Sequence, residues 1–230
     1  MVTLVNRQEV FAKYPNITSE IAVIQCDFFD DDEQYFEGKQ DLAAYRDMFD
    51  ARHLSTHRPE RWYSTLNLAY TNLSNYVSAL SEKLIQLFTE IEVHGLVMLA
   101  HYKLGLVGNA NNSHPPLQNA LKQLVSLTGS IHYDEAMAFD VNDLPMMLNI
   151  VFWLIRCNAR APEFIYFHDQ DEKLAFYLCK YGALHLVEFN SKIISADLLT
   201  RYGLQLVQGS CDDQFQESSR IEGRKSMPLL

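Results

Sequence analysis

The chain has 230 residues, of which 48% are hydrophobic and 21% are charged, proportions that are ordinary for a globular protein with a buried core. Its 29 acidic and 19 basic side chains give a formal net charge of −10. This balance argues against nucleic-acid binding through a basic patch, because such binding depends on clustered Lys and Arg. The same charge suits a basic protein partner.

The N-terminus and the cysteine spacing favour a protein of the cytoplasm that does not enter a membrane. Residues 1–16 lack the basic start and apolar run of a signal peptide. The most apolar run, Leu144–Ile155, is too short to span a bilayer. No Cys-x-x-Cys pair and no zinc-finger spacing is present, so we expect reduced thiols at all four cysteines. These are Cys26, Cys157, Cys179 and Cys211.

The first 58 residues predict one strand and one helix. Glu20–Phe29 is rich in β-branched and aromatic residues and ends at an acidic run, which is typical of a strand. Lys39–His53 has the apolar spacing of a short helix. Pro59 is then well placed for the first turn of the next helix.

Residues 63–91 carry the most regular hydrophobic pattern of the chain. Two apolar series recur every seven residues, which predicts a helix of about four heptads. The flanking positions carry few charges, which favours a helix embedded in the protein's own core over a coiled coil between two copies. A homodimer through this helix is the alternative. The series are Leu66, Leu73, Leu80 and Leu87, and Tyr63, Tyr70, Val77, Leu84 and Ile91.

Three further helical segments are expected before residue 160. The segment 93–106 reads as a continuation of the heptad helix. Pro116–Gly129 has a proline at its start and a glycine at its end, as helices often do. Residues 144–158 follow Asp143 as a capping residue and are almost wholly apolar, so we expect a central helix that packs against the heptad helix.

From Glu163 onward, short strands and helices alternate. The expected helices end at glycines, and the links between elements are short. This β-α-β-α-β order predicts a small parallel sheet with right-handed crossovers. The strands are expected at 163–168, 183–189 and 204–208, and the helices at 171–182 and 195–203.

The predicted fold class is therefore α/β, in a single domain of residues 1–208. A helix-rich N-terminal layer occupies about 39–158, and the parallel unit occupies about 163–208. Residues 209–230 read as a polar tail. Within this tail, Ile221–Arg224 has the form of an engineered protease site, and we give it no functional weight.

Polar residues at the carboxyl ends of the predicted parallel strands form the candidate site, because ligands bind at that edge of a parallel sheet. His168 and Asp169 follow one strand, and Glu188 ends the next. Two carboxylates and an imidazole would suit metal-assisted hydrolysis or phosphodiester cleavage. The neighbouring residues expected to assist binding are Asp171, Asn190 and Ser191.

The same cluster also has a structural interpretation, which we favour. Asp169 suits a helix N-cap, and Asp171 and Glu172 suit the positive end of the helix dipole. No phosphate-loop, dinucleotide or hydrolase-elbow motif is present, and the sequence names no cofactor and no metal. The favoured function is therefore protein–protein binding, as an inhibitor, immunity factor or adaptor, through the many Tyr and Phe residues. The alternative is a metal-assisted hydrolase or nuclease.

Overall fold

The computed structural model describes residues 1–30, 38–54, 57–69, 73–107, 114–158, 160–209 and 215. Within these residues one eight-stranded sheet has the order β1-β4-β3-β5-β6-β7-β2-β8, and neighbouring strands pair antiparallel. The strands are Thr3–Val5 (β1), Arg61–Leu68 (β2), Gly95–Ala100 (β3), Ala136–Asp140 (β4), Ile165–Asp169 (β5), Leu174–Leu178 (β6), Leu184–Phe189 (β7) and Leu204–Leu206 (β8). The helices are Arg7–Lys13 (α1), Pro15–Phe28 (α2), Lys39–Met48 (α3), Leu73–Glu90 (α4), Pro115–Thr128 (α5), Leu144–Cys157 (α6) and Ala196–Arg201 (α7).

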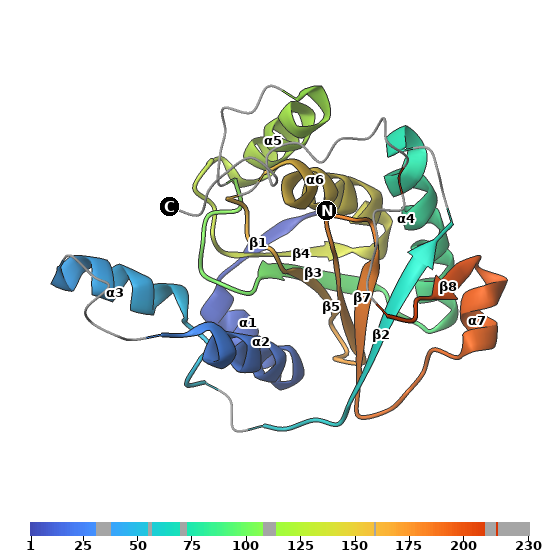
Figure 1. Cartoon of the computed structure of the whole chain (residues 1–230), viewed down its shortest axis with the longest axis horizontal. Helices are drawn as coiled ribbons and strands as arrows, with labels where there is room; N and C mark the ends of the chain where they lie inside the picture. Colours follow the sequence, from blue (N-terminus) through green and yellow to red (C-terminus); the bar gives the residue numbers. More distant parts are fainter. Residues whose placement is uncertain are drawn as a thin grey trace.

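Helices lie on both faces of the sheet (Figure 1). On one face, α4, α5, α6 and α7 contribute buried side chains to the larger hydrophobic core. On the other face, α1 and α2 form a smaller core with alternate residues of the same strands. The helix α3 has no buried residue and extends away from the sheet. The two faces are therefore covered unequally.

The predicted parallel unit at 163–208 is wrong. Four of its elements, β5, β7, α7 and β8, lie near the expected positions, but 171–182 contains strand β6 instead of a helix, between β5 and β7. A tight turn causes the difference. The Asp169 carboxylate accepts a hydrogen bond from the Leu174 N–H at 2.8 Å, and Glu172 adopts a left-handed φ of 58°. The chain therefore reverses within the turn and needs no crossover helix.

The predicted helix at 63–91 is wrong in its first part, because that part forms β2 between β7 and β8. Leu66 and Leu68 alternate toward the core with the period of a strand. The remainder forms α4, whose Tyr76 packs against Phe152 of α6 with ring centroids 5.5 Å apart. The predicted homodimer through 63–91 required one continuous helix, and this helix is absent because residues 61–68 form a strand. The core-facing leucines of α4 are all about 1% exposed: Leu80, Leu84 and Leu87.

Two shorter predictions are wrong, and four helices are confirmed. Glu20–Phe29 lies almost wholly in α2, where Ile17 and Ile21 are buried one helical turn apart, so tertiary packing overrides β-propensity. The segment 93–106 contains β3, which sits inside the sheet between β4 and β5. The confirmed helices are α3, α5, α6 and α7, predicted at 39–53, 116–129, 144–158 and 195–203.

Buried polar contacts fix α2 against the sheet. The Gln25 side-chain amide donates to the His101 carbonyl at 2.6 Å. In α1, Arg7 donates to the Ala100 carbonyl at 2.7 Å and pairs with Asp50 at 2.9 Å. Because these groups are buried, losing one partner would leave another unsatisfied. These contacts therefore give α1 and α2 one defined position over the strands.

The predicted tail, 209–230, lies outside the described residues except for its first residue and Phe215. Phe215 is 6% exposed, and its ring lies 4.8 Å from Tyr76 and 6.0 Å from Phe152. This point of the tail therefore packs on the helical core. The single domain of 1–208 stays a prediction. None of the helices in the described ranges combines the length and the apolar character that a membrane crossing requires.

Candidate functional site

The predicted catalytic residues do not share a site. His168 and Asp169 are neighbours on β5 and therefore point to opposite faces of the sheet. Glu188 lies on β7, with β6 between it and β5. All three side chains are buried, at most 1% exposed. A substrate or metal would have to cross the sheet to contact them together, so the hydrolase hypothesis has no geometric support.

The two predicted carboxylates bind backbone groups. Asp169 holds the turn between β5 and β6, as described above. Glu188 Oε1 accepts hydrogen bonds from Ile193 at 2.6 Å and from Ile194 at 2.8 Å, and so fixes the segment after β7. Burial raises the pKa of both carboxyl groups, and that of Asp169 reaches about 6. Both residues are explained by local structure.

His168 is a buried packing residue on the α1–α2 face. Its ring meets Tyr14 edge-on with centroids 4.7 Å apart, and Nδ1–H donates to the Asp169 carbonyl at 3.1 Å. Burial lowers the pKa of His168 to about 4, so the ring is neutral at pH 7. Within the described part of the chain, its Nε2 has no hydrogen-bond partner. The ring is shielded from solvent and from any substrate.

The three predicted binding residues lie in exposed turns. The side chain of Asp171 is 62% exposed, and its carboxylate pairs with Lys173 at 3.5 Å. Asn190 and Ser191 are also exposed, and Asn190 has a left-handed φ of 61° at the end of β7. Among the described residues, no group of three His, Cys, Asp or Glu side chains is placed to hold a metal ion.

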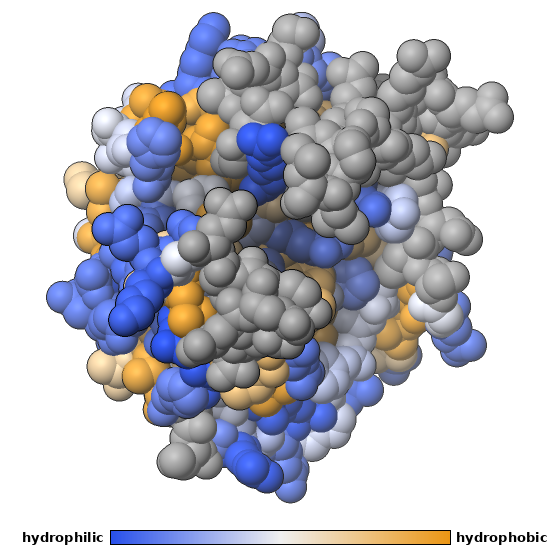
Figure 2. All heavy atoms as spheres, turned by 60° about the vertical axis from the view of Figure 1, so that its left-hand side comes forward, coloured by the Kyte–Doolittle hydropathy of each residue, from blue (hydrophilic) through white to orange (hydrophobic). Residues whose placement is uncertain are grey.

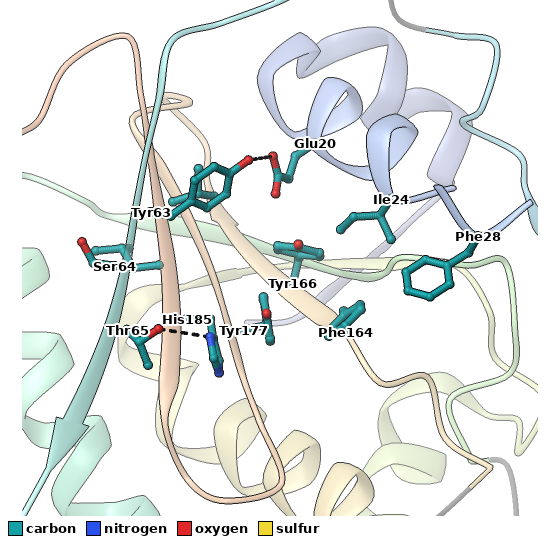
Figure 3. Close-up of a pocket in the computed structure, with 12 residues that line it drawn as sticks. Glu20, Ile24, Phe28, Tyr63, Ser64, Thr65, Phe164, Tyr166, Tyr177 and His185 are labelled. Atoms are coloured by element: carbon teal, nitrogen blue, oxygen red, sulfur yellow. Dashed lines mark hydrogen bonds between the residues drawn. The ribbon is translucent and has the colours of Figure 1, made fainter. Parts of the chain in front are cut away.

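A cleft opens on the α2 side of the sheet, where part of β6, β7 and β2 is uncovered (Figure 3). Its cavity measures about 300 Å³. The strands place every second residue toward this cleft, and α2 places every fourth residue toward it, because these spacings bring side chains to one face. We call it the aromatic cleft and define it by Glu20, Ile24, Phe28, Tyr63, Phe164, Tyr166, Tyr177 and His185.

One wall of the aromatic cleft comes from α2. Glu20, Ile24 and Phe28 are spaced by four residues and therefore project from one side of the helix, toward the strands (Figure 3). Residues of the adjoining helix surface, such as Ile21, face the core instead. Phe28 is 59% exposed and lies at the rim. The helix thus divides its apolar side chains between the core and the cleft.

Glu20 is the acidic group of the cleft, and its charge is compensated. Its Oε2 accepts a hydrogen bond from the Tyr63 hydroxyl at 3.0 Å and lies 3.0 Å from Arg61 Nε. Burial raises the pKa of Glu20, while Tyr63 and Arg61 oppose this rise. Burial, followed by the nearby Glu20 charge, raises the pKa of Tyr63 to about 12. The three side chains form a neutral, hydrogen-bonded group at one end of the cleft.

Aromatic rings form the floor. Tyr177 stacks on His185 with centroids 4.7 Å apart and an interplanar angle of 8°, and it meets Tyr166 at 5.2 Å and Phe164 at 4.9 Å. His185 Nδ1 lies 3.4 Å from the Thr65 hydroxyl, and burial lowers the pKa of His185. The floor is therefore aromatic and uncharged at pH 7.

A second cavity of about 380 Å³ adjoins the aromatic cleft. The two cavities share Thr65, Phe164, Tyr177 and His185. Two side chains of opposite charge, Glu163 and Lys180, line the second cavity. The first cavity is therefore a neutral aromatic space, and the second, on the other side of the shared residues, is polar.

Sequence reasoning missed this site. Its residues come from three separate parts of the chain, α2, β2 and the successive strands β5 to β7, and no sequence motif connects them. One usable signal was the four-residue spacing of Glu20, Ile24 and Phe28. It was hidden because the segment was assigned to a strand, which places residues four apart on one face as well.

Comparison with protein-family models, curated proteins and solved structures finds no match to this chain. The fold and the aromatic cleft therefore carry the functional argument. They define a mixed α and β protein that has one antiparallel sheet, with an open aromatic cleft on the less covered face.

Proposed function

We propose that this protein binds another protein, and that a segment of the partner enters the aromatic cleft. The observation that supports this proposal is an uncovered cavity of about 300 Å³ in which six of the twelve lining residues are Tyr, Phe or His. Aromatic residues are enriched in protein interfaces and dominate their energetics. An inhibitor, immunity factor or adaptor of the cytoplasm would act in this way.

The rim of the cleft supports a protein partner over a small ligand alone. Phe28 is 59% exposed, Tyr63 is 65% exposed and Val23 on the same helix is 48% exposed. A ligand confined to the cavity would leave these side chains in water, whereas a protein surface would cover them. On the face of the molecule in Figure 2, apolar patches are small and lie among hydrophilic residues. A cavity with several exposed apolar side chains beside it is the better interface.

The charge of the chain supports a basic partner. The formal net charge of −10 would accelerate encounter with a positively charged protein. Charge of this kind acts mainly on the association rate, while buried rings at the centre of an interface hold the complex together. The two features are therefore compatible parts of one binding surface.

The test is a pull-down from the native host with three forms of the full chain. These are the original protein, a cleft variant with Phe28→Ala and Tyr63→Ala, and a control variant with Leu4→Ala and Leu206→Ala. The control residues are 45% and 50% exposed and lie on the two outer strands, so both variants remove exposed apolar side chains. Thermal unfolding shows that each variant is folded.

We expect the original protein and the control variant to recover the same partner protein. The cleft variant should recover at least tenfold less of this partner. The same proteins with all three forms would refute the role of the cleft. A hydrolase activity that the original protein has and the cleft variant lacks would also refute the proposal, because the function would then be catalysis.

A further inference from the structure

We infer that the group which enters the aromatic cleft is a neutral aromatic side chain, Trp, Tyr or Phe, presented by the partner protein. This inference rests on the proposed function and names the chemistry of the partner. It is argued from the charge, the ring geometry and the size of the cleft. A cationic anchor, Lys or Arg, is the competing chemistry, because cations also bind to aromatic faces.

The charge of the cleft disfavours a cation. Glu20 already has Arg61 Nε at 3.0 Å and the Tyr63 hydroxyl at 3.0 Å, so its carboxylate is compensated. A second cation beside it would meet the Arg61 guanidinium, and like charges at short range repel. The imidazole of His185 carries no negative charge in either protonation state, so it offers a cation no ion pair. A neutral ring avoids this repulsion and loses little hydration on entry.

The ring geometry favours another aromatic group. Aromatic pairs prefer centroid separations of about 4.5–7 Å in edge-to-face or offset arrangements. The floor already shows both arrangements: Tyr177 stacks on His185 at 4.7 Å and meets Tyr166 edge-to-face at 5.2 Å. A ring that enters the cavity above Tyr166 and below Ile24 would continue this series. Phe28 at the rim would cover it from the solvent side.

The size of the two cavities favours a polypeptide segment that presents its side chains in sequence. Each cavity, at about 300 and about 380 Å³, lies at the lower end of the range of roughly 300–1,000 Å³ for small-molecule sites. The cavities share Tyr177 and His185 but differ in chemistry, since one is neutral and the other contains Glu163 and Lys180. A chain with an aromatic residue followed by polar residues fits this order.

The test uses two small probes on the full chain with labelled Tyr and His rings. The probes are N-acetyl-tryptophanamide, which is neutral and aromatic, and N-acetyl-argininamide, which is cationic. NMR spectra of the Tyr177 and His185 rings are recorded as each probe is added to tens of millimolar. The variant Phe28→Ala and the control Leu206→Ala, whose original side chains are 59% and 50% exposed, are titrated in the same way.

We expect the tryptophan probe to shift both ring signals in a saturable manner and the arginine probe to leave them unchanged. Phe28→Ala should weaken binding about threefold, while Leu206→Ala should leave it unchanged. Shifts with the arginine probe alone, no shifts with either probe, or equal affinity in both variants would each overturn the inference. The pull-down above can still succeed in these cases, so a failure of the anchor chemistry is distinguishable from a failure of the proposed function.

Discussion

Replacing His168 tests the buried, neutral state of this ring. In the folded protein its pKa is about 4, because burial disfavours the charged form, whereas the ordinary value is 6.5. A histidine whose pKa is lowered on folding contributes stability that is complete above the unfolded pKa and is lost as the pH falls toward the folded pKa. The window therefore runs from about pH 6.5 to about pH 4.

The magnitude follows from the two pKa values. Between pH 7 and pH 5 the unfolded chain takes up a proton at this position and the folded chain does not, which costs the folded protein about 2 kcal/mol. His168→Phe and His168→Leu remove the titrating ring and so remove this loss. Relative to the original protein, both variants should gain about 2 kcal/mol between pH 7 and pH 5. Other groups cancel in this difference, including Asp169, whose raised pKa acts with the opposite sign.

The measurement is urea unfolding followed by circular dichroism at pH 7, 6 and 5, with the free energy of unfolding compared at each pH. Two substitutions are used because Phe is larger than His and strains the contact with Tyr14, whereas Leu leaves space there. His94→Phe, at an exposed position, controls for replacing a histidine. If the difference between variant and original protein stays constant from pH 7 to pH 5, the ring titrates in the folded protein, and the burial argument is refuted.

Three further predictions concern stability in the same urea assay at pH 7. Asp169→Ala should lower the free energy of unfolding by about 2 kcal/mol because the Leu174 N–H loses its acceptor, while Asp169→Asn should lose less; equal stability of all three forms would contradict this. Glu188→Gln should stay within about 1 kcal/mol of the original, since one side-chain oxygen can still accept from Ile193 and Ile194, and a larger loss would show that the charge itself is needed. Phe215→Ala should cost about 3 kcal/mol because the ring is buried on the helical core, and an unchanged midpoint would show that this contact is not formed in solution.

The helical part of the fold was predictable where the sequence signals were local. Pro115–Thr128 is bounded by a proline and by Gly129, which has a left-handed φ of 71°. Leu144–Cys157 is mostly apolar, and eleven of its fourteen residues are buried. In both cases the residues that define the helix lie within it or beside it. The prediction therefore did not depend on the rest of the chain.

The sheet was not predictable because the turn after β5 has no glycine signal, and because Gly182 in the turn between β6 and β7, with a φ of 87°, suited a helix end equally well. At the turn after β5, Glu172 adopts a left-handed φ of 58°, which is uncommon for a residue with a side chain. The conformation is stabilised by the Asp169 carboxylate and by the contact of the Glu172 carboxylate with the Asn16 N–H at 2.6 Å, far away in sequence. Asp169 suited a helix cap equally well in sequence. Only tertiary contact distinguishes the two uses of the same acidic residue.

The difference between a helix cap and a turn also changes where a candidate site can lie. In a parallel arrangement, His168, Asp169 and Glu188 would meet at one edge of the sheet, where a ligand could reach them. In the antiparallel arrangement, Tyr166 of β5 and His185 of β7 instead point to the less covered face of the sheet, beneath α2. The Asp169 carboxylate stabilises the turn between β5 and β6, the Glu188 carboxylate stabilises the segment after β7, and aromatic residues of β5, β6 and β7 contribute to the cleft floor. Substitutions at Asp169 should therefore affect binding only through stability, whereas Phe28→Ala, at the exposed rim of the cleft, should weaken binding and leave the free energy of unfolding unchanged.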